Sequence, residues 1–134
     1  MPRGNPELRR QQRVLDTFMR RLLKAYPREV QGVILYGSLA HGLPGSQGAI
    51  TLLVVSQSKD ILTTALQEMA EEVDKGRRFR TMLVPLVLRP LEVRQGLLAG
   101  DPFLVAVFAQ GRVLYDDGTL AGLRLAIGKP REAS

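Results

Sequence analysis

Residues 36–55 read YGSLAHGLPGSQGAITLLVV and carry the most informative pattern in the chain. An apolar run ends in Gly37-Ser38, a glycine-rich link follows, and a second apolar run begins at Ala49. A strand that turns through Gly-Ser into a short helical segment presents free backbone N–H groups, which together with the Ser38 hydroxyl suit a phosphate. Yet residues 30–59 contain no Asp and no Glu. The stretch therefore predicts the frame of an anion-binding site that lacks carboxylates.

The apolar spacing on both sides of this stretch predicts an α/β (α+β) fold, a mixed β-sheet of about four strands covered by helices. Strands are expected at 30–38, 49–56, 79–88 and 112–116, and helices at 5–26, 59–75, 91–98, 102–109 and 119–127. Asn5 and Asp101 each precede a proline and are predicted N-caps. Pro85 lacks the N–H of a ladder hydrogen bond, so its strand is bulged there or lies at a sheet edge. In the second helix, Ile61 is expected on the buried face.

Length and composition indicate one domain. The 134 residues are 45% hydrophobic and 24% charged, which is the balance of a globular protein. A single domain at 1–128 is expected, followed by a disordered tail at 129–134. No apolar run approaches the ~18 residues of a membrane span, and no apolar segment follows the basic N-terminus as it does in a secretory signal. Without cysteine, neither a disulfide nor a thiolate metal site can form, and the expected location is cytoplasmic.

The net charge of +6 lies in the first 28 residues, because the remainder of the chain holds equal numbers of basic and acidic residues. The basic residues of the first predicted helix are Arg9, Arg10, Arg13, Arg20, Arg21 and Lys24. They form a candidate contact surface for nucleic acid or an acidic partner, or simply a solvated helix face.

The pattern VILYGSLAHG followed by GAITLLVV resembles the signature of the minimal nucleotidyltransferases, members of the DNA polymerase β-like superfamily. In that family an apolar strand ends in Gly-Ser, usually followed by Ala-Arg-Gly, and a short loop leads to Ser-Asp-x-Asp on the next strand. PFLVAVFAQGRVLYDD resembles the family's usual ending, so that the similarity covers roughly residues 8–125. The resemblance implies a nucleotidyltransferase-like fold in which Gly37 and Ser38 grip the triphosphate. His41 stands where the family usually has arginine, and it completes the predicted nucleotide-binding set.

The same resemblance implies that the catalytic carboxylates are missing. The family's two aspartates share one face of their strand and hold two Mg²⁺ ions with the triphosphate, and a later strand adds a third carboxylate. Here the two aspartate positions fall on Ala49 and Thr51, and no acid occurs between residues 75 and 91. Mg²⁺ sites are built from carboxylates, phosphates and waters. No catalytic residue, metal site or cofactor is therefore expected.

A nucleotide bound without Mg²⁺ is still compatible with the Gly37-Ser38 turn. Arg77, Arg78 or Arg80, before the third strand, could then supply the counter-charge, since arginine binds phosphates well. The alternative is that these three arginines form a solvated basic turn.

Three functions are consistent with these patterns. The first is a pseudoenzyme, a catalytically degenerate nucleotidyltransferase-like domain that acts as a binding or regulatory module. For that case the resemblance implies a small helical partner of the HEPN type in a toxin–antitoxin-like pair, and a homo-oligomer is the alternative. The second is an active Mg²⁺-dependent nucleotidyltransferase with unconventional metal ligands. The third is weak nucleic-acid binding through the basic N-terminal helix, without an aromatic stacking platform.

Overall fold

A computed structural model of the protein describes residues 5–45, 48–76 and 81–127. In chain order the elements are α1 (Pro6–Ala25), β1 (Gly32–Tyr36), the 3-10 helix η1 (Ser38–His41), β2 (Ala49–Val55), α2 (Lys59–Gly76), β3 (Met82–Leu88), α3 (Pro90–Ala99), α4 (Pro102–Gln110), β4 (Arg112–Asp116) and α5 (Thr119–Arg124). All predicted helices and strands are present, with small differences at their ends. The predicted tail and the three arginines at 77, 78 and 80 lie outside the described residues.

The four strands form one mixed sheet in the order β3-β2-β1-β4. β1 is antiparallel to both of its neighbours, β2 and β4, whereas β2 and β3 run parallel and are joined by α2 as a crossover helix. β3 lies at the edge of the sheet. Of the two alternatives predicted for Pro85, the edge position is therefore confirmed, and its missing N–H is tolerated there.

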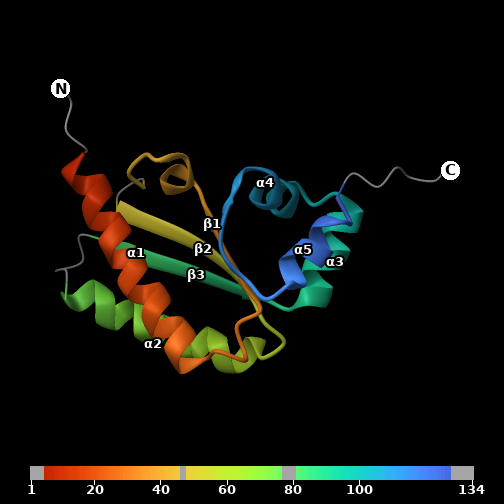
Figure 1. Ribbon diagram of the computed structural model, residues 1–134, viewed down its shortest axis with the longest axis horizontal. Coiled ribbons are helices and arrows are strands. Elements are labelled where there is room, and N and C mark those ends of the chain that lie inside the picture. Colours follow the sequence, from red (N-terminus) through yellow and green to blue (C-terminus); the bar gives the residue numbers. More distant parts are fainter. Residues whose placement is uncertain (1–4, 46–47, 77–80, 128–134) are drawn as a thin grey trace, which may run out of the picture.

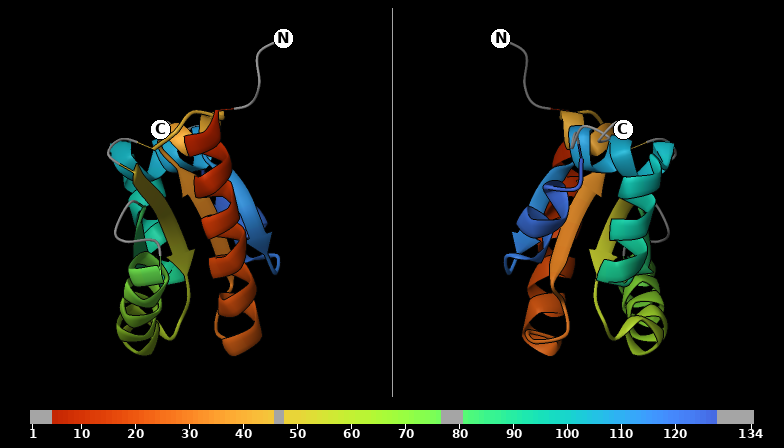
Figure 2. Two further views of the ribbon diagram at one scale, coloured as in Figure 1. Left: turned by 90° about the vertical axis from the view of Figure 1, so that its left-hand side faces the viewer. Right: turned by 90° about the vertical axis from the view of Figure 1, so that its right-hand side faces the viewer.

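Helices cover both faces of this sheet. α1 and α2 pack on one face around residues such as Phe18, Leu52 and Leu62, and α3, α4 and α5 pack on the other around Ile34 and Phe108. Figure 1 shows α3, α4 and α5 grouped together, away from α1 and α2. The long helices α1 and α2 extend roughly along the strands (Figure 2). The predicted mixed sheet covered by helices is confirmed, and no described helix is long and apolar enough to cross a membrane.

Both predicted N-caps are confirmed. The side-chain oxygen Oδ1 of Asn5 accepts a hydrogen bond from the N–H of Glu7 over 2.8 Å at the start of α1. Oδ1 of Asp101 accepts from the N–H of Phe103 over 2.8 Å at the start of α4. Each cap satisfies a backbone donor that the first helical turn leaves open, which fixes where these two helices begin.

The predicted burial of Ile61 is wrong, since its side chain is 66% exposed. α2 is turned so that Leu62 and Leu66 are fully buried, and Ala70 and Val73 follow on the same line. Burial of Leu62 and Leu66, one turn apart, fixes the orientation of α2. Ile61 lies about 100° around the helix from Leu62 and therefore faces solvent.

Candidate functional site

The Gly37-Ser38 turn joins β1 to η1 at the surface of the protein. Gly37 has φ 84° and ψ −164°, a combination that is open almost only to glycine. A Cβ here would also lie 2.9 Å from Oγ1 of Thr51 on the neighbouring strand. The N–H of Ala40 donates to the carbonyl oxygen of Gly37, but no described residue accepts from the N–H groups of Ser38 and Leu39. The turn thus leaves two backbone donors open.

Thr51 lies opposite Tyr36 in the antiparallel ladder of β1 and β2. Its hydroxyl donates a hydrogen bond to the carbonyl oxygen of Tyr36 over 2.6 Å. The Thr51 hydroxyl is therefore hydrogen-bonded to the backbone of Tyr36, the residue that precedes the turn. A position that the family resemblance assigns to a metal-binding aspartate makes a structural contact here.

The register of β2 and β3 identifies the residues beside Ala49 and Thr51. Met82 pairs with Ala49 and Val84 pairs with Thr51. Because side chains alternate along a strand, these four residues project from the same face of the sheet. Met82 and Val84 are 53% and 40% exposed, so this part of the face is apolar and open. Within the described residues, no group of three or more His, Asp or Glu side chains could hold a metal ion.

The link between the turn and β2 is held in place by α1. Gln11 of α1 is fully buried, and its Oε1 accepts a hydrogen bond from the N–H of Gly45 over 2.7 Å. The link folds tightly here, because a Cβ on Gly45 would overlap the carbonyl oxygen of Ala49. Gln11 is not among the residues predicted from the sequence. Its spacing from Leu8 and Leu15, three and four residues away on the apolar stripe, is the signal that could have found it.

A pocket of about 330 Å³ lies between the turn and α4. Gly37, Ser38 and His41 line it on one side, and Phe103, Ala106 and Gln110 of α4 line it on the other. The structure thus brings together the three residues that the sequence predicts for nucleotide binding. It also places them against α4, a helix that sequence analysis did not connect with the site.

Two aromatic rings form part of the wall of this pocket. Tyr36 and Phe103 meet edge to face, with ring centroids 5.3 Å apart and planes at 85°. Burial raises the pKa of the Tyr36 hydroxyl above its ordinary value of 10.0, so this hydroxyl is uncharged near neutral pH. Neither ring is among the site residues predicted from the sequence, since the contact joins residues that are far apart in the chain.

Solved structures share this arrangement of helices and strands. The chain resembles a crystal structure of the toxin–antitoxin MntA–HpeT in which two aspartates, two positions apart, are replaced by glutamate. The TM-score is 0.52 at 13% identity, over 81% of this chain and 80% of that chain. A crystal structure of the toxin–antitoxin with AMP-PNP gives a TM-score of 0.51 at 17% identity, over 81% and 80% of the two chains. The fold is nucleotidyltransferase-like. No family model and no curated protein matches the sequence, and at these identities the similarity shows the fold alone.

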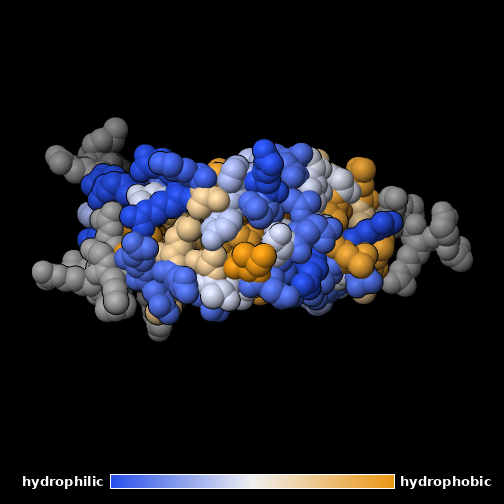
Figure 3. Space-filling view, turned by 90° about the horizontal axis from the view of Figure 1, so that it is seen from below, coloured by the Kyte–Doolittle hydropathy of each residue, from blue (hydrophilic) through white to orange (hydrophobic). Residues whose placement is uncertain are grey.

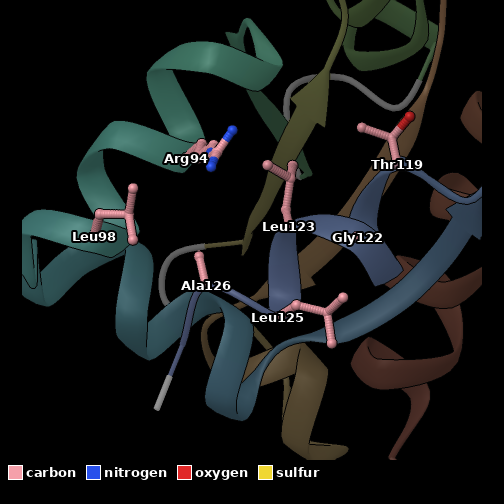
Figure 4. Close-up of a pocket in the computed structure, with 7 residues that line it drawn as sticks. All are labelled: Arg94, Leu98, Thr119, Gly122, Leu123, Leu125 and Ala126. Carbon is pink, nitrogen blue, oxygen red and sulfur yellow. The ribbon is translucent and has the colours of Figure 1, made fainter. Parts of the chain in front are cut away.

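A second hollow of about 330 Å³ in this nucleotidyltransferase-like fold lies between α3 and α5. Figure 4 shows Arg94 and Leu98 of α3 facing Leu123 of α5, with Thr119 on the far side of Leu123. The Thr119 hydroxyl already donates to Oδ1 of Asp117. Hydrophobic side chains gather toward this end of the molecule in the view from below (Figure 3). None of the predicted site residues lines this hollow, which is therefore separate from the pocket beside the turn.

Proposed function

We propose that this protein is a catalytically degenerate nucleotidyltransferase-like domain that acts as a binding or regulatory module. The observation that carries the proposal is the hydrogen bond from Thr51 to the carbonyl oxygen of Tyr36. It gives a structural role to the side chain at the position that the family resemblance assigns to a metal-binding aspartate. Ala49 and Val84, on the same sheet face, have no side-chain atom that could bind a metal ion. Phosphoryl transfer depends on metal ions to orient the reactants and neutralise charge. The retained turn is therefore proposed to serve binding.

The partner is proposed to be a small helical protein of the HEPN type, in a toxin–antitoxin-like pair. Both similar structures are described as toxin–antitoxin structures, and one contains AMP-PNP. The two substituted aspartates of the first structure have the same spacing as Ala49 and Thr51. A nucleotide on the Gly37-Ser38 turn and a homo-oligomer are the other binding partners compatible with this role.

Loss of catalysis is tested by incubating the protein with labelled ATP, GTP, CTP or UTP and Mg²⁺, with and without a candidate HEPN-type protein. We expect no transfer to either protein and no pyrophosphate release above a blank. The Ser38→Ala variant, measured in parallel, shows whether any activity depends on the Ser38 hydroxyl. Turnover that depends on Ser38 would establish the alternative, an active enzyme with unconventional metal ligands.

The protein partner is tested by co-expression with a HEPN-type protein and by size-exclusion chromatography with light scattering. A stoichiometric complex is expected. Reversing two charges on α1, Arg13→Glu with Arg20→Glu, maps the contribution of that helix, and Arg94→Glu with Arg112→Glu provides an exposed pair elsewhere as the control. A chain that stays monomeric with and without the helical protein contradicts the proposal.

Nucleic-acid binding is a second candidate, favoured by the exposed side of α1. Arg9, Arg13, Arg20 and Lys24 recur at spacings that place them along one stripe about 22 Å long. None of these four cations forms an ion pair with a described residue, whereas Arg10 pairs with Glu7 on the same helix. Binding to a labelled single strand and a labelled duplex should then fall steeply as salt rises. Absence of nucleic-acid binding at low salt, or an affinity that does not change with salt concentration, would contradict this second function.

A further inference from the structure

The pocket between the Gly37-Ser38 turn and α4 has a lining of described residues without Lys, Arg, Asp or Glu. A triphosphate carries several negative charges, and a phosphate removed from water without a cation or a metal ion is strongly disfavoured. The open N–H of Ser38 and the side chains of Ser38, His41 and Gln110 could donate to a phosphate, but the described lining offers no Lys or Arg to neutralise its charge. The pocket therefore suits an uncharged ligand better than the triphosphate that the turn alone suggests.

The apolar surface of the pocket is suited to a flat ring. Phe103 is 41% exposed and Leu43 is 60% exposed, so both present large apolar side chains to the opening. The edge-to-face contact with Tyr36 holds the Phe103 ring in a defined orientation. Aromatic rings pack well on surfaces of this kind, by stacking or by edge contacts.

The polar groups of the pocket are few and uncharged or weakly basic. The side chains of Ser38, His41 and Gln110 line it and make no hydrogen bond to any described residue. A hydroxyl, an imidazole and a primary amide together offer both donors and acceptors. Such a set matches the edge of a nitrogen heterocycle, which also carries donors and acceptors side by side. A volume of about 330 Å³ falls at the lower end of small-molecule sites.

We propose that this pocket binds an uncharged planar nitrogen heterocycle of nucleoside size, held by its ring between Phe103 and the Gly37-Ser38 turn. The proposal rests on the loss of transfer chemistry argued above, because an active enzyme would need the triphosphate and its metal ions in this region. Phosphates attached to such a ligand stay in solvent and add no affinity. The pocket then binds a base or a nucleoside in preference to a nucleoside triphosphate.

The test is titration calorimetry with adenosine, guanosine, cytidine and uridine, and with the four corresponding triphosphates in the absence of Mg²⁺. At least one nucleoside is expected to bind, its triphosphate to bind no more tightly, and the nucleoside affinity to change less than twofold between low and high salt. The Ala106→Phe variant fills the pocket from an exposed position on α4 and should weaken nucleoside binding at least tenfold. Ala109→Phe, on the same helix outside the pocket, should leave it unchanged.

Three results would overturn the proposal. They are the absence of binding by all four nucleosides, a triphosphate that binds at least tenfold more tightly than its nucleoside, and nucleoside binding that survives Ala106→Phe. Thermal unfolding of both variants verifies that each is folded. These results are independent of the transfer assay, in which turnover and not binding is measured, so failure of the ligand proposal leaves the proposed loss of catalysis standing.

Discussion

The hydroxyl of Thr51 donates to the carbonyl oxygen of Tyr36, 2.6 Å away, across the pair of the β1–β2 ladder that lies next to the turn. Oγ1 of Thr51 also lies where a Cβ on Gly37 would need space. One small side chain thus ties the end of β1 to β2 and shapes the turn that follows. An aspartate at this position would set a carboxylate against a carbonyl oxygen, two acceptors without a donor between them.

Thr51→Val should lower the free energy of unfolding by about 1–3 kcal/mol, because it keeps the shape of the side chain but leaves the Tyr36 carbonyl without its donor. Urea denaturation measures the effect. Thr64→Val, at an exposed position on α2, is the control and should change stability little. Equal effects at the two positions would mean that the Thr51 hydrogen bond contributes nothing.

Gly37→Ala should destabilise the fold by about 1–3 kcal/mol, since its backbone conformation is open almost only to glycine. Part of this cost is the contact between the new methyl group and Thr51. A double-mutant cycle with Thr51→Ala should therefore show a coupling of about 0.5 kcal/mol or more, with Gly37→Ala less harmful in the Thr51→Ala background. Additive effects in that cycle would contradict the contact.

Gln11→Ala should cost about 1–3 kcal/mol, because the partly buried N–H of Gly45 loses its acceptor. Gln12→Ala, the neighbouring amide on α1, is the matched control and should be nearly neutral. Hydrogen exchange provides the second readout: the Gly45 amide should lose protection in Gln11→Ala and keep it in Gln12→Ala.

Glu92 should make stability fall in acid. Its carboxylate accepts hydrogen bonds from the N–H of Arg89 and from Nζ of Lys59, each over 2.9 Å. The backbone hydrogen bond from Arg89 and then the Lys59 contact lower the pKa of Glu92 below its ordinary value of 4.5. Because the folded-state pKa is the lower one, the stabilisation is complete above the ordinary value and is lost as pH falls through the lowered value.

The Glu92→Gln variant should therefore lose less stability than the unaltered protein as pH is lowered from neutral. The difference is expected to stay below about 1 kcal/mol, since the carboxylate is 41% exposed and screened by water. Denaturation midpoints across an acid series measure it. Glu68→Gln, at an exposed position on α2, should not change the acid profile, and a profile of Glu92→Gln that matches the unaltered protein would refute the prediction.

The sequence predicts the elements of this fold well because each carries a local signal. Asn5 and Asp101 mark helix starts by capping chemistry, and Pro85 marks an edge strand by its missing donor. Ile61 shows where the local signal fails. Periodicity defines an apolar side of α2 but not its centre, and the rotation of the helix is decided by which leucines fill the core.

The site was only partly predictable, for a different reason. Gly37, Ser38 and His41 belong to one short segment, so the sequence brings them together without help from the fold. Phe103 and Gln11 reach the same region from distant helices. Their contributions depend on the strand register and on helix packing, which no local pattern contains.

The position of β1 in the sheet has a consequence for how the chain is made. Val33, Ile34 and Leu35 are fully buried, and one of the two partners of β1 is β4, which follows the other three strands in chain order. Until β4 emerges, β1 exposes a bare apolar edge of the kind that recruits other chains into aggregates. A nascent or truncated chain that stops before Arg112 is therefore expected to need a chaperone, whereas a chain that includes β4 covers this edge.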